Sequence, residues 1–242
     1  MKVLISKKTG KYYYPTESQD YHCKEGIISQ EELNSNKSVI KSNKDKEFFN
    51  FNANNYDYRQ KIKRGPQIIT PKDLGYIIAR TSINKDSIIV EAGGGSGAAT
   101  TFFAKLVKEV NTFEIVEEHY KIIQKNLKFL NCDNVNLTLG NLKDHISNIK
   151  EYDLLFLDMP NPHEILNENI SGLKSGNYIV CYVPSISQIQ VLSEIILNRE
   201  DLYLEEITEV GLRHWKVAGQ ISRPEHQKEI DHTAFLVFIR KN

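Results

Sequence analysis

From Pro71 onward the sequence alternates between extended and helical patterns, and this alternation constrains the fold more than any other feature. Short β-branched runs such as "SIIVEA" (87–92) and "YDLLFLDMP" (152–160) alternate with longer runs that carry apolar residues at helical spacing. Five strand–helix units of this kind indicate a parallel sheet with helices on both faces. The predicted helices span 71–83, 98–110, 118–131, 163–174 and 187–199, and the predicted strands span 87–92, 111–116, 134–141, 152–160 and 177–185.

The last part of the chain departs from this alternation. Residues 202–217 and 232–241 are both strand-like, and the sequence between them has no good helical pattern. Such a pair indicates an antiparallel hairpin at one edge of the sheet. The predicted fold is therefore α/β and Rossmann-like, and ligands of such sheets bind outside the carboxyl ends of the strands.

The first 55 residues have a different sequence pattern. Short aromatic or β-branched segments such as "KVLIS" and "KYYYP" are broken by turn-forming runs such as "KKTG" and "TESQD". Short strand-like segments separated by turns predict a small β module over residues 1–55, followed by the main domain over residues 56–242. We expect the module to make RNA or oligomer contacts.

Overall composition excludes several classes of protein. The 242 residues carry no net charge, and no apolar run approaches the roughly 20 residues that span a membrane. The three cysteines and seven histidines show no metal-ligand spacing, and the cysteines form no convincing disulfide framework. We therefore expect a cytoplasmic protein that binds no metal and no membrane.

The charge is nevertheless unevenly distributed. Residues 1–65 contain 13 Lys and Arg against 8 Asp and Glu, and the densest basic run, "YDYRQKIKRGPQ", interleaves cations with tyrosines. Its cations are Arg59, Lys61, Lys63 and Arg64. A segment of this kind can attract a phosphate backbone, and composition alone leaves a solvated linker equally open.

A glycine-rich turn follows the strand at 87–92. Gly93, Gly95 and Ala98 satisfy the pattern G-x-G-x-x-G/A, in which glycine lets a ligand approach the backbone. Glu114 lies about twenty residues further on, where an acid can bind both hydroxyls of a ribose. The turn alone fits either NAD or S-adenosylmethionine, and such a turn can also be a simple strand–helix joint.

Two observations favour the methyl donor. Glu91 directly precedes the glycines, and a carboxylate there suits a cationic ligand but would repel a pyrophosphate. The antiparallel closing strands are also foreign to the usual dehydrogenase half-domains. An NAD-dependent oxidoreductase remains an alternative that leaves both observations unexplained.

At this point the sequence resembles a known family, the tRNA (adenine-N1)-methyltransferases. The shared motifs, in order, are "RGPQIITPKD", "EAGGGSGAAT", "TFEIVEEH", "LGN", "LFLDMPNPHEIL", "RHWKV" and "DHTAFLVFIRK". The resemblance covers residues 60–242 well and the N-terminal module more loosely, through "YHCKEGIISQEEL". It implies a seven-stranded class I S-adenosylmethionine-dependent methyltransferase, commonly a homotetramer, that modifies adenosine 58 of the tRNA T-loop and, in archaea, often position 57.

The resemblance also implies a set of cofactor-binding residues. The methionine end of the cofactor would lie along the glycine turn, the ribose on the acid that follows the next strand, and the adenine beside "LGN". The set comprises Glu91, Gly93, Gly95, Ser96, Gly97, Ala98, Ala99, Glu114, His119, Asn141 and Asp158. The family usually carries an acid or a lysine where this chain has Asn141.

Asp158 is the predicted catalytic residue. It ends the most apolar strand, where a carboxylate is costly unless it has a partner. Alkylation of adenine at N1 makes the base cationic and acidifies its N6 amino group, so a carboxylate that accepts from N6–H would align the base and stabilise the developing charge. The alternative is that Asp158 caps the helix predicted from His163.

The substrate side departs from the family pattern at two positions. Thr70 stands where many relatives have Tyr, and His163 stands where the family usually has Trp. The candidate tRNA-binding residues are Gln67, Thr70, Arg59, Lys63, Arg64, Arg213 and Trp215, with Lys61 and Arg223 as further basic candidates. Arg213 and Trp215 could equally belong to a strand edge packed on the core.

Two other functions share much of this sequence pattern. A methyltransferase of a protein or small molecule would have the same turn without needing the basic module. A non-catalytic tRNA-binding subunit would be expected to lose the glycines and Asp158, and this chain keeps both.

Overall fold

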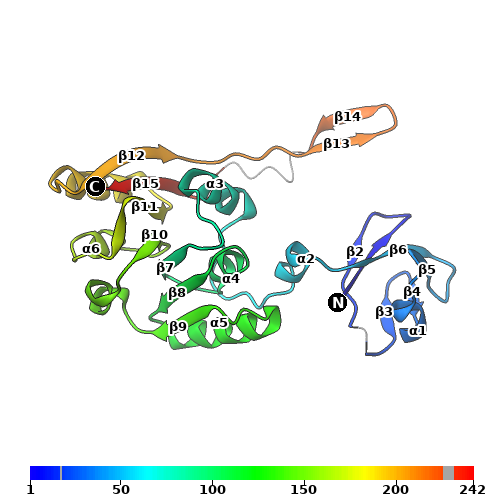
Figure 1. The fold of residues 1–242 in the computed structure, drawn as a ribbon. Helices are drawn as coiled ribbons and strands as arrows, with labels where there is room; N and C mark the ends of the chain where they lie inside the picture. Colours follow the sequence, from blue (N-terminus) through cyan, green and yellow to red (C-terminus); the bar gives the residue numbers. More distant parts are fainter. Residues whose placement is uncertain (17, 226–231) are drawn as a thin grey trace. The chain divides into compact units, whose positions relative to one another are not determined.

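The computed structural model describes residues 1–16, 18–225 and 232–242. The chain forms two compact units, Met1–Ile62 and Lys63–Asn242, and each is described by itself (Figure 1). The sequence-based division falls between residues 55 and 56, whereas in the structure residues 56–62 belong to the first unit. That stretch includes all but the first residue of the short helix α2 (Asn55–Arg59), whose capping box is formed by Asn54 and Asp57.

The first unit is built on an antiparallel sheet of four strands in the order β2-β1-β6-β5. Its strands are β1 (Lys2–Ser6), β2 (Tyr12–Tyr13), β5 (Val39–Lys41) and β6 (Glu47–Asn52), with a second hairpin of β3 (Tyr21–Cys23) and β4 (Gly26–Ile28) and a helix α1 (Gln30–Asn34). A small core forms between these parts from Leu4, Tyr13, Ile28, Leu33, Ile40 and Phe48. Only one face of the four-stranded sheet contributes to it, because strand residues alternate between faces.

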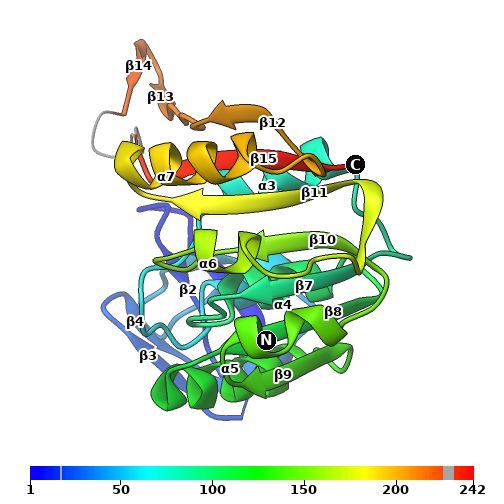
Figure 2. The same ribbon diagram turned by 90° about the vertical axis from the view of Figure 1, so that its left-hand side faces the viewer.

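The second unit is built on a seven-stranded sheet in the order β12-β15-β11-β10-β7-β8-β9 (Figure 2). The bounds are β7 (Ile88–Ala92), β8 (Glu109–Glu114), β9 (Val135–Leu139), β10 (Tyr152–Leu157), β11 (Leu173–Val183), β12 (Leu202–Thr208) and β15 (Phe235–Lys241). The five strands β9, β8, β7, β10 and β11 run parallel, and β15 runs antiparallel to both β11 and β12. The predicted parallel sheet and antiparallel closing pair are confirmed.

Buried strands and amphipathic helices explain this arrangement. In β10 every residue except Asp153 is buried, as expected for a central parallel strand covered on both faces. The helix α5 (Glu117–Leu130) turns Ile123, Asn126 and Leu130 inward, and its C-cap residue Asn131 adopts the left-handed conformation. The helical elements are α3 (Pro71–Thr81), α4 (Ala98–Ala104), α5 (Glu117–Leu130), η1 (Leu142–Asp144), η2 (Ile146–Asn148), α6 (His163–Leu166) and α7 (Ile186–Leu197).

Two predicted helix boundaries are wrong. The helix predicted over 98–110 ends at Ala104, because Glu109 already pairs with Ile88 in the sheet. The helix predicted over 163–174 ends at Leu166, because Leu173 pairs with Tyr152. In both cases strand pairing overrides a local helical pattern.

The prediction of a single strand over 202–217 is also wrong, because these residues contribute to two separate strands. The edge strand β12 ends at Thr208, and the following residues form a second hairpin of β13 (Trp215–Ala218) and β14 (Ile221–Pro224). Across the described ranges, the structure contains no helix that is both long and apolar enough to cross a membrane.

Candidate active site

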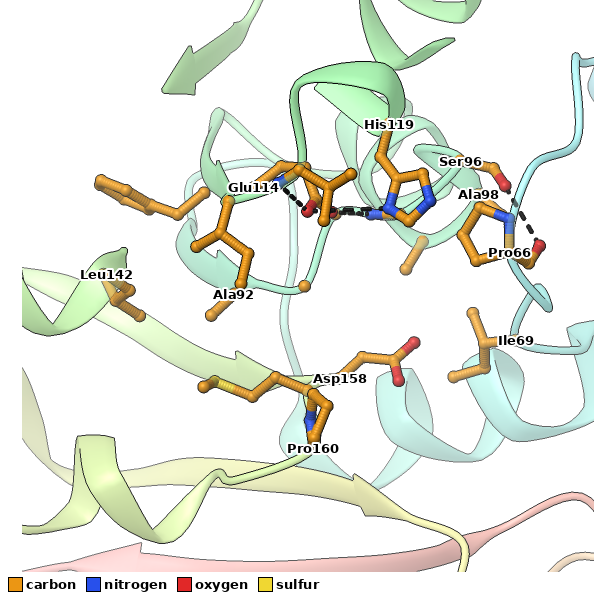
Figure 3. A pocket seen from close by; sticks show the side chains of 18 of the residues that line it. Pro66, Ile69, Ala92, Ser96, Ala98, Glu114, His119, Leu142, Asp158 and Pro160 are labelled. Atoms are coloured by element: carbon orange, nitrogen blue, oxygen red, sulfur yellow. Dashed lines mark hydrogen bonds and ion pairs between the residues drawn. The ribbon is translucent and has the colours of Figure 1, made fainter. Parts of the chain in front are cut away.

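A cavity of about 350 Å³ lies at the carboxyl ends of four neighbouring strands, β9, β8, β7 and β10 (Figure 3). This volume is within the usual range for small-molecule sites, and strand ends are where open α/β sheets bind ligands. The lining residues are Pro66, Gln67, Ile68, Ile69, Ala92, Gly93, Gly94, Gly95, Ser96, Ala98, Ala99, Phe113, Glu114, Ile115, Val116, His119, Gly140, Asn141, Leu142, Asp158, Met159 and Pro160.

The glycine turn brings the ends of β7 and β10 together. Gly93 has a φ of 84°, and a Cβ on it would lie 1.7 Å from the carbonyl oxygen of Asp158. The same two strand ends are joined where the Asp158 amide donates to the Ala92 carbonyl at 2.9 Å. Only glycine allows this approach, so the turn places the predicted catalytic residue as well as the predicted cofactor loop.

Glu114 fixes the turn from the neighbouring strand. Its two carboxylate oxygens accept backbone N–H groups from Gly95 at 2.7 Å and from Val116 at 2.8 Å, and its side chain is almost fully buried. Nδ1 of His119 lies 3.8 Å from the Glu114 Oε1. Figure 3 shows both side chains beside the cavity, and both belong to its lining.

A buried asparagine that the sequence analysis did not single out ties the segment before the cavity to the turn. The Asn126 amide donates to the carbonyls of Lys63 and Ser96 at 2.8 and 2.7 Å, and its oxygen accepts the Lys63 N–H at 2.8 Å. The Ser96 hydroxyl also accepts the Gly65 N–H at 3.2 Å. The available signal was a polar residue three positions after Ile123, on the apolar face of a helix.

Glu91 lies behind the turn, outside the cavity lining. It is fully buried, and its carboxylate accepts a hydrogen bond of 2.6 Å from the Thr100 hydroxyl. The pKa of Glu91 is raised to about 7, mainly by burial; hydroxyl hydrogen bonds oppose this shift, and the nearby negative charges of Asp158 and Glu114 add to it. Its direct contact with a cofactor stays a prediction that the lining does not support.

Asp158 lies in the lining, immediately after β10. Burial raises its pKa to about 7. Figure 3 shows the carboxylate directed across the cavity toward Ile69. The alternative that Asp158 caps α6 is wrong. The N-cap of this helix is Pro162, and within the described residues no side chain makes a capping hydrogen bond to it.

The remaining predicted cofactor residues divide into two groups. Gly93, Gly95, Ser96, Ala98 and Ala99 all line the cavity, whereas Gly97 lies outside the lining as the left-handed N-cap of α4. Asn141 also lines the cavity, and its side-chain oxygen accepts the Lys143 N–H at 3.0 Å. Asn141 therefore caps the short helix η1 at the end of β9.

On the substrate side, Gln67 lines the cavity, whereas Thr70 and His163 are outside its lining. Thr70 is the N-cap of α3, and its hydroxyl donates to the Asp73 carboxylate at 2.8 Å. Asp73 is fully buried and paired with Lys72 at 2.8 Å. The buried ion pair was not anticipated, because "PKD" reads as an ordinary first turn of a helix.

The basic candidates are divided between the two units. Lys63 and Arg64 are exposed and directly precede the cavity-lining segment that starts at Pro66. Arg59 belongs to the first unit, is half-buried, and has its pKa lowered to about 10 by burial. In the same unit, Nζ of Lys61 lies 5.3 Å from the ring centre of Tyr14.

The final candidates lie on or beside the β13–β14 hairpin. Trp215 is 59% exposed, and Arg213 and Arg223 are also exposed. The alternative that Arg213 and Trp215 pack against the core is therefore wrong. All three lie outside the cavity lining.

The residues of the cavity fit S-adenosylmethionine. Its walls carry the carboxylates of Glu114 and Asp158, which favour a cationic ligand over a pyrophosphate. The glycine backbone leaves one wall free of side chains beside Ala98 and Ala99. In the described ranges there is no group of three or more His, Cys, Asp or Glu side chains that could hold a metal ion.

The strand order, the antiparallel β15 and this strand-end cavity define a class I S-adenosylmethionine-dependent methyltransferase. The model of one family, described as "tRNA methyltransferase complex GCD14 subunit", matches residues 58–234. The chain belongs to this family, which confirms the resemblance drawn from the sequence motifs.

Named relatives agree with this assignment. The chain is 28% identical to "tRNA (adenine(58)-N(1))-methyltransferase TrmI" of Thermus thermophilus, over 99% of this chain and 96% of the relative. It is 26% identical to "tRNA (adenine(57)-N(1)/adenine(58)-N(1))-methyltransferase TrmI" of Methanocaldococcus jannaschii, over 99% and 94%. The solved structure of tRNA (m1A58) methyltransferase TrmI from Aquifex aeolicus is 30% identical, with a TM-score of 0.84 over 100% of this chain and 96% of that one.

Proposed function

We propose that this chain transfers a methyl group from S-adenosylmethionine to N1 of the adenine at position 58 of the tRNA T-loop, with position 57 as a second target. The observation that carries the proposal is the position of Asp158 in the same cavity as the glycine turn and Glu114. A carboxylate that can recognise adenine thus stands beside the residues that fit the methyl donor.

Within the cavity, Glu114 is positioned to bind the ribose of the cofactor. Its oxygens are already oriented by the Gly95 and Val116 amides, and each keeps capacity to accept a ribose hydroxyl. Ser96, Ala98 and Ala99 would lie along the methionine end, and His119 and Asn141 along the nucleoside. When bound, S-adenosylmethionine would supply an electrophilic methyl carbon, with its sulfur as the leaving group that takes the electron pair of the carbon–sulfur bond.

Asp158 supplies the chemistry on the side of the base. The lone pair of adenine N1 forms the new bond to carbon, and the base gains a positive charge. Asp158 accepts a hydrogen bond from the N6 amino group, which aligns N1 and stabilises that charge, and then takes the N6 proton and releases it to water. Its pKa, raised to about 7 by burial, suits a proton acceptor at neutral pH.

The tRNA must also be held outside the cavity. The target adenosine has to be extracted from its stack, at a cost of a few kcal/mol. Lys63 and Arg64 can contact phosphates next to the cavity, and the exposed Arg213, Trp215 and Arg223 provide a second contact region. Gln67 and Thr70 are proposed to border the base, and Arg59 contributes less because it is half-buried.

We further propose a homotetramer in which the β13–β14 hairpin contacts another copy. The exposed side chains of Val217 and Ile221 support this, because apolar groups exposed on one hairpin favour association. The N-terminal unit is proposed to contact tRNA, and the cytoplasmic location stays a prediction from cysteine usage.

Mass spectrometry of nucleosides tests the proposal. An unmodified tRNA transcript is incubated with the protein and S-adenosylmethionine and then digested, and the expected product is 1-methyladenosine in the T-loop fragment. Methylation of another nucleoside, or none, would contradict the proposal. Calorimetric titration with S-adenosylhomocysteine and NADH provides the companion measurement, in which only the former is expected to bind.

A further inference from the structure

The four-stranded sheet of the first unit has one face that the small core does not use. Cross-strand pairing places Val39, Phe49, Ile5 and Tyr12 in one row across β5, β6, β1 and β2. Phe51 lies two residues beyond Phe49 and therefore on the same face. We call this surface the aromatic face, and define it by Tyr12, Phe49 and Phe51.

The three rings of the aromatic face are exposed to solvent. Tyr12 is 54% exposed, Phe49 40% and Phe51 48%. Their neighbours on alternate positions, Phe48 and Tyr13, are buried in the core of the unit. The exposed rings are therefore additional to those that the fold needs, and keeping them in water costs free energy that a ligand could recover.

Cations lie beside these rings. Nζ of Lys7 is 5.5 Å from the ring centre of Phe49 and is paired with Glu47 at 2.8 Å. Lys41 pairs with Glu47 across β5 and β6. It is two residues after Val39 on β5, and it therefore lies on the same face as Val39 and Phe49. Residues 1–62 as a whole carry 11 Lys and Arg against 8 Asp and Glu.

Rings combined with cations favour a nucleic acid over a second copy of the chain. Charged side chains are depleted in the centre of protein interfaces, whereas unpaired bases stack on exposed aromatic rings while lysines contact the phosphates. The exposed aliphatic side chains that suit self-association lie elsewhere, at Val217 and Ile221 of the β13–β14 hairpin.

From this geometry we infer that the aromatic face binds unpaired nucleotides of the tRNA substrate, by stacking bases on Phe49, Phe51 and Tyr12. The inference rests on the proposed function, because it takes tRNA as the ligand. It gives the first unit a part in holding the RNA, in addition to the basic residues of the second unit, whose strand-end cavity carries out the chemistry.

The test compares rings with apolar groups that lack a ring. Full-length Phe49→Leu/Phe51→Leu and Phe49→Tyr/Phe51→Tyr variants are titrated with fluorescent tRNA transcript at one fixed salt concentration. The leucine pair is expected to weaken binding about tenfold or more and to raise KM for tRNA in proportion, since each stacked base contributes measurably. The tyrosine pair keeps both rings and is expected to stay within about threefold of the unaltered protein.

A control variant distinguishes stacking at the aromatic face from the loss of any exposed ring. Tyr203 on β12 is 67% exposed, so Tyr203→Leu removes an even more accessible ring from a different sheet and is expected to leave tRNA binding unchanged. The kcat and the affinity for S-adenosylhomocysteine are expected to be unchanged in all variants. Equal affinity of the leucine pair and the unaltered protein for tRNA would overturn the inference.

Two further outcomes have separate meanings. A smaller assembly of the leucine pair in sedimentation equilibrium would show that the face joins copies of the chain, and would overturn the inference. Methylation of tRNA by the unaltered protein is measured in parallel. Its absence would contradict the proposed function, whereas methylation with unchanged tRNA binding by the leucine pair would contradict the aromatic face alone.

Discussion

The strand-end cavity of residues 63–242 and the aromatic face of residues 1–62 are built by different means. The cavity depends on the backbone, because Gly93 lets two strand ends meet and Glu114 is held by two backbone amides. The aromatic face depends on side chains that project from a regular sheet. The proposed chemistry therefore depends on backbone positions, whereas the inferred stacking of bases depends on exposed side chains.

If this division is correct, the largest loss of activity comes from the cavity. Asp158→Ala is expected to lower the methylation rate about 10²–10⁴-fold and to affect cofactor affinity much less, because the residue acts mainly on the base. Transfer of a labelled methyl group to tRNA measures the rate. The exposed Asp133→Ala in the same unit is the control, and equal rates for the two variants would remove Asp158 from catalysis.

A pair of glycines tests whether the backbone builds the cavity. Gly93 and Gly176 have similar φ values, 84° and 82°, but only at Gly93 would a Cβ meet other atoms within 4 Å. Gly176→Ala is expected to cost about 1–2 kcal/mol from backbone strain alone. Gly93→Ala is expected to cost about 3–5 kcal/mol and to weaken cofactor binding, because the strand ends must move apart.

Urea unfolding and calorimetric titration measure both effects. Equal losses of unfolding free energy in the two alanine variants would show that strain, rather than the approach to Asp158, sets the need for glycine at position 93.

The smallest expected effect is on stability, at Glu91. Its pKa is about 7 in the folded protein and ordinarily 4.5, so between these pH values the unfolded chain ionises while the folded one keeps the proton. This carboxyl therefore stabilises the fold at low pH, and that contribution is lost as the pH rises from 4.5 to 7.

Glu91→Gln cannot ionise and should not show this loss. Relative to the unaltered protein, its unfolding free energy is expected to increase by about 1–3 kcal/mol between pH 4.5 and pH 8. Urea unfolding of both proteins across this range measures the difference. Parallel curves would mean that Glu91 ionises normally in the fold.

Most of the larger unit was predictable from the sequence. Parallel strands buried on both faces, such as β10, read as continuous apolar runs, and Pro71 marks a helix start. The errors occur where long-range pairing decides the structure, as in the early end of α4 at Ala104. The β13–β14 hairpin was missed because residues 215–217 alternate between apolar and polar side chains and therefore resemble the end of the strand predicted over 202–217.

The site was predictable where it follows strand ends and less so elsewhere. The sequence placed the glycine turn, Glu114 and Asp158 together because each lies at the end of a recognisable strand, and all three line the cavity. Asn126 was missed because its partners, the backbone atoms of Lys63 and Ser96, are distant in sequence. The aromatic face was missed because the pairing of β1, β2 and β6 is needed to place its rings together.

The most direct test of the account is whether Asp158 recognises the N6 amino group of the target base. Single-turnover methylation is measured for the unaltered protein and Asp158→Ala, each with tRNA that carries either adenine or purine, which lacks that amino group, at position 58. Loss of the amino group reduces the reactivity of N1 in both proteins, but a further loss of about tenfold or more is expected only where Asp158 is present. The same loss in both proteins would contradict the claim.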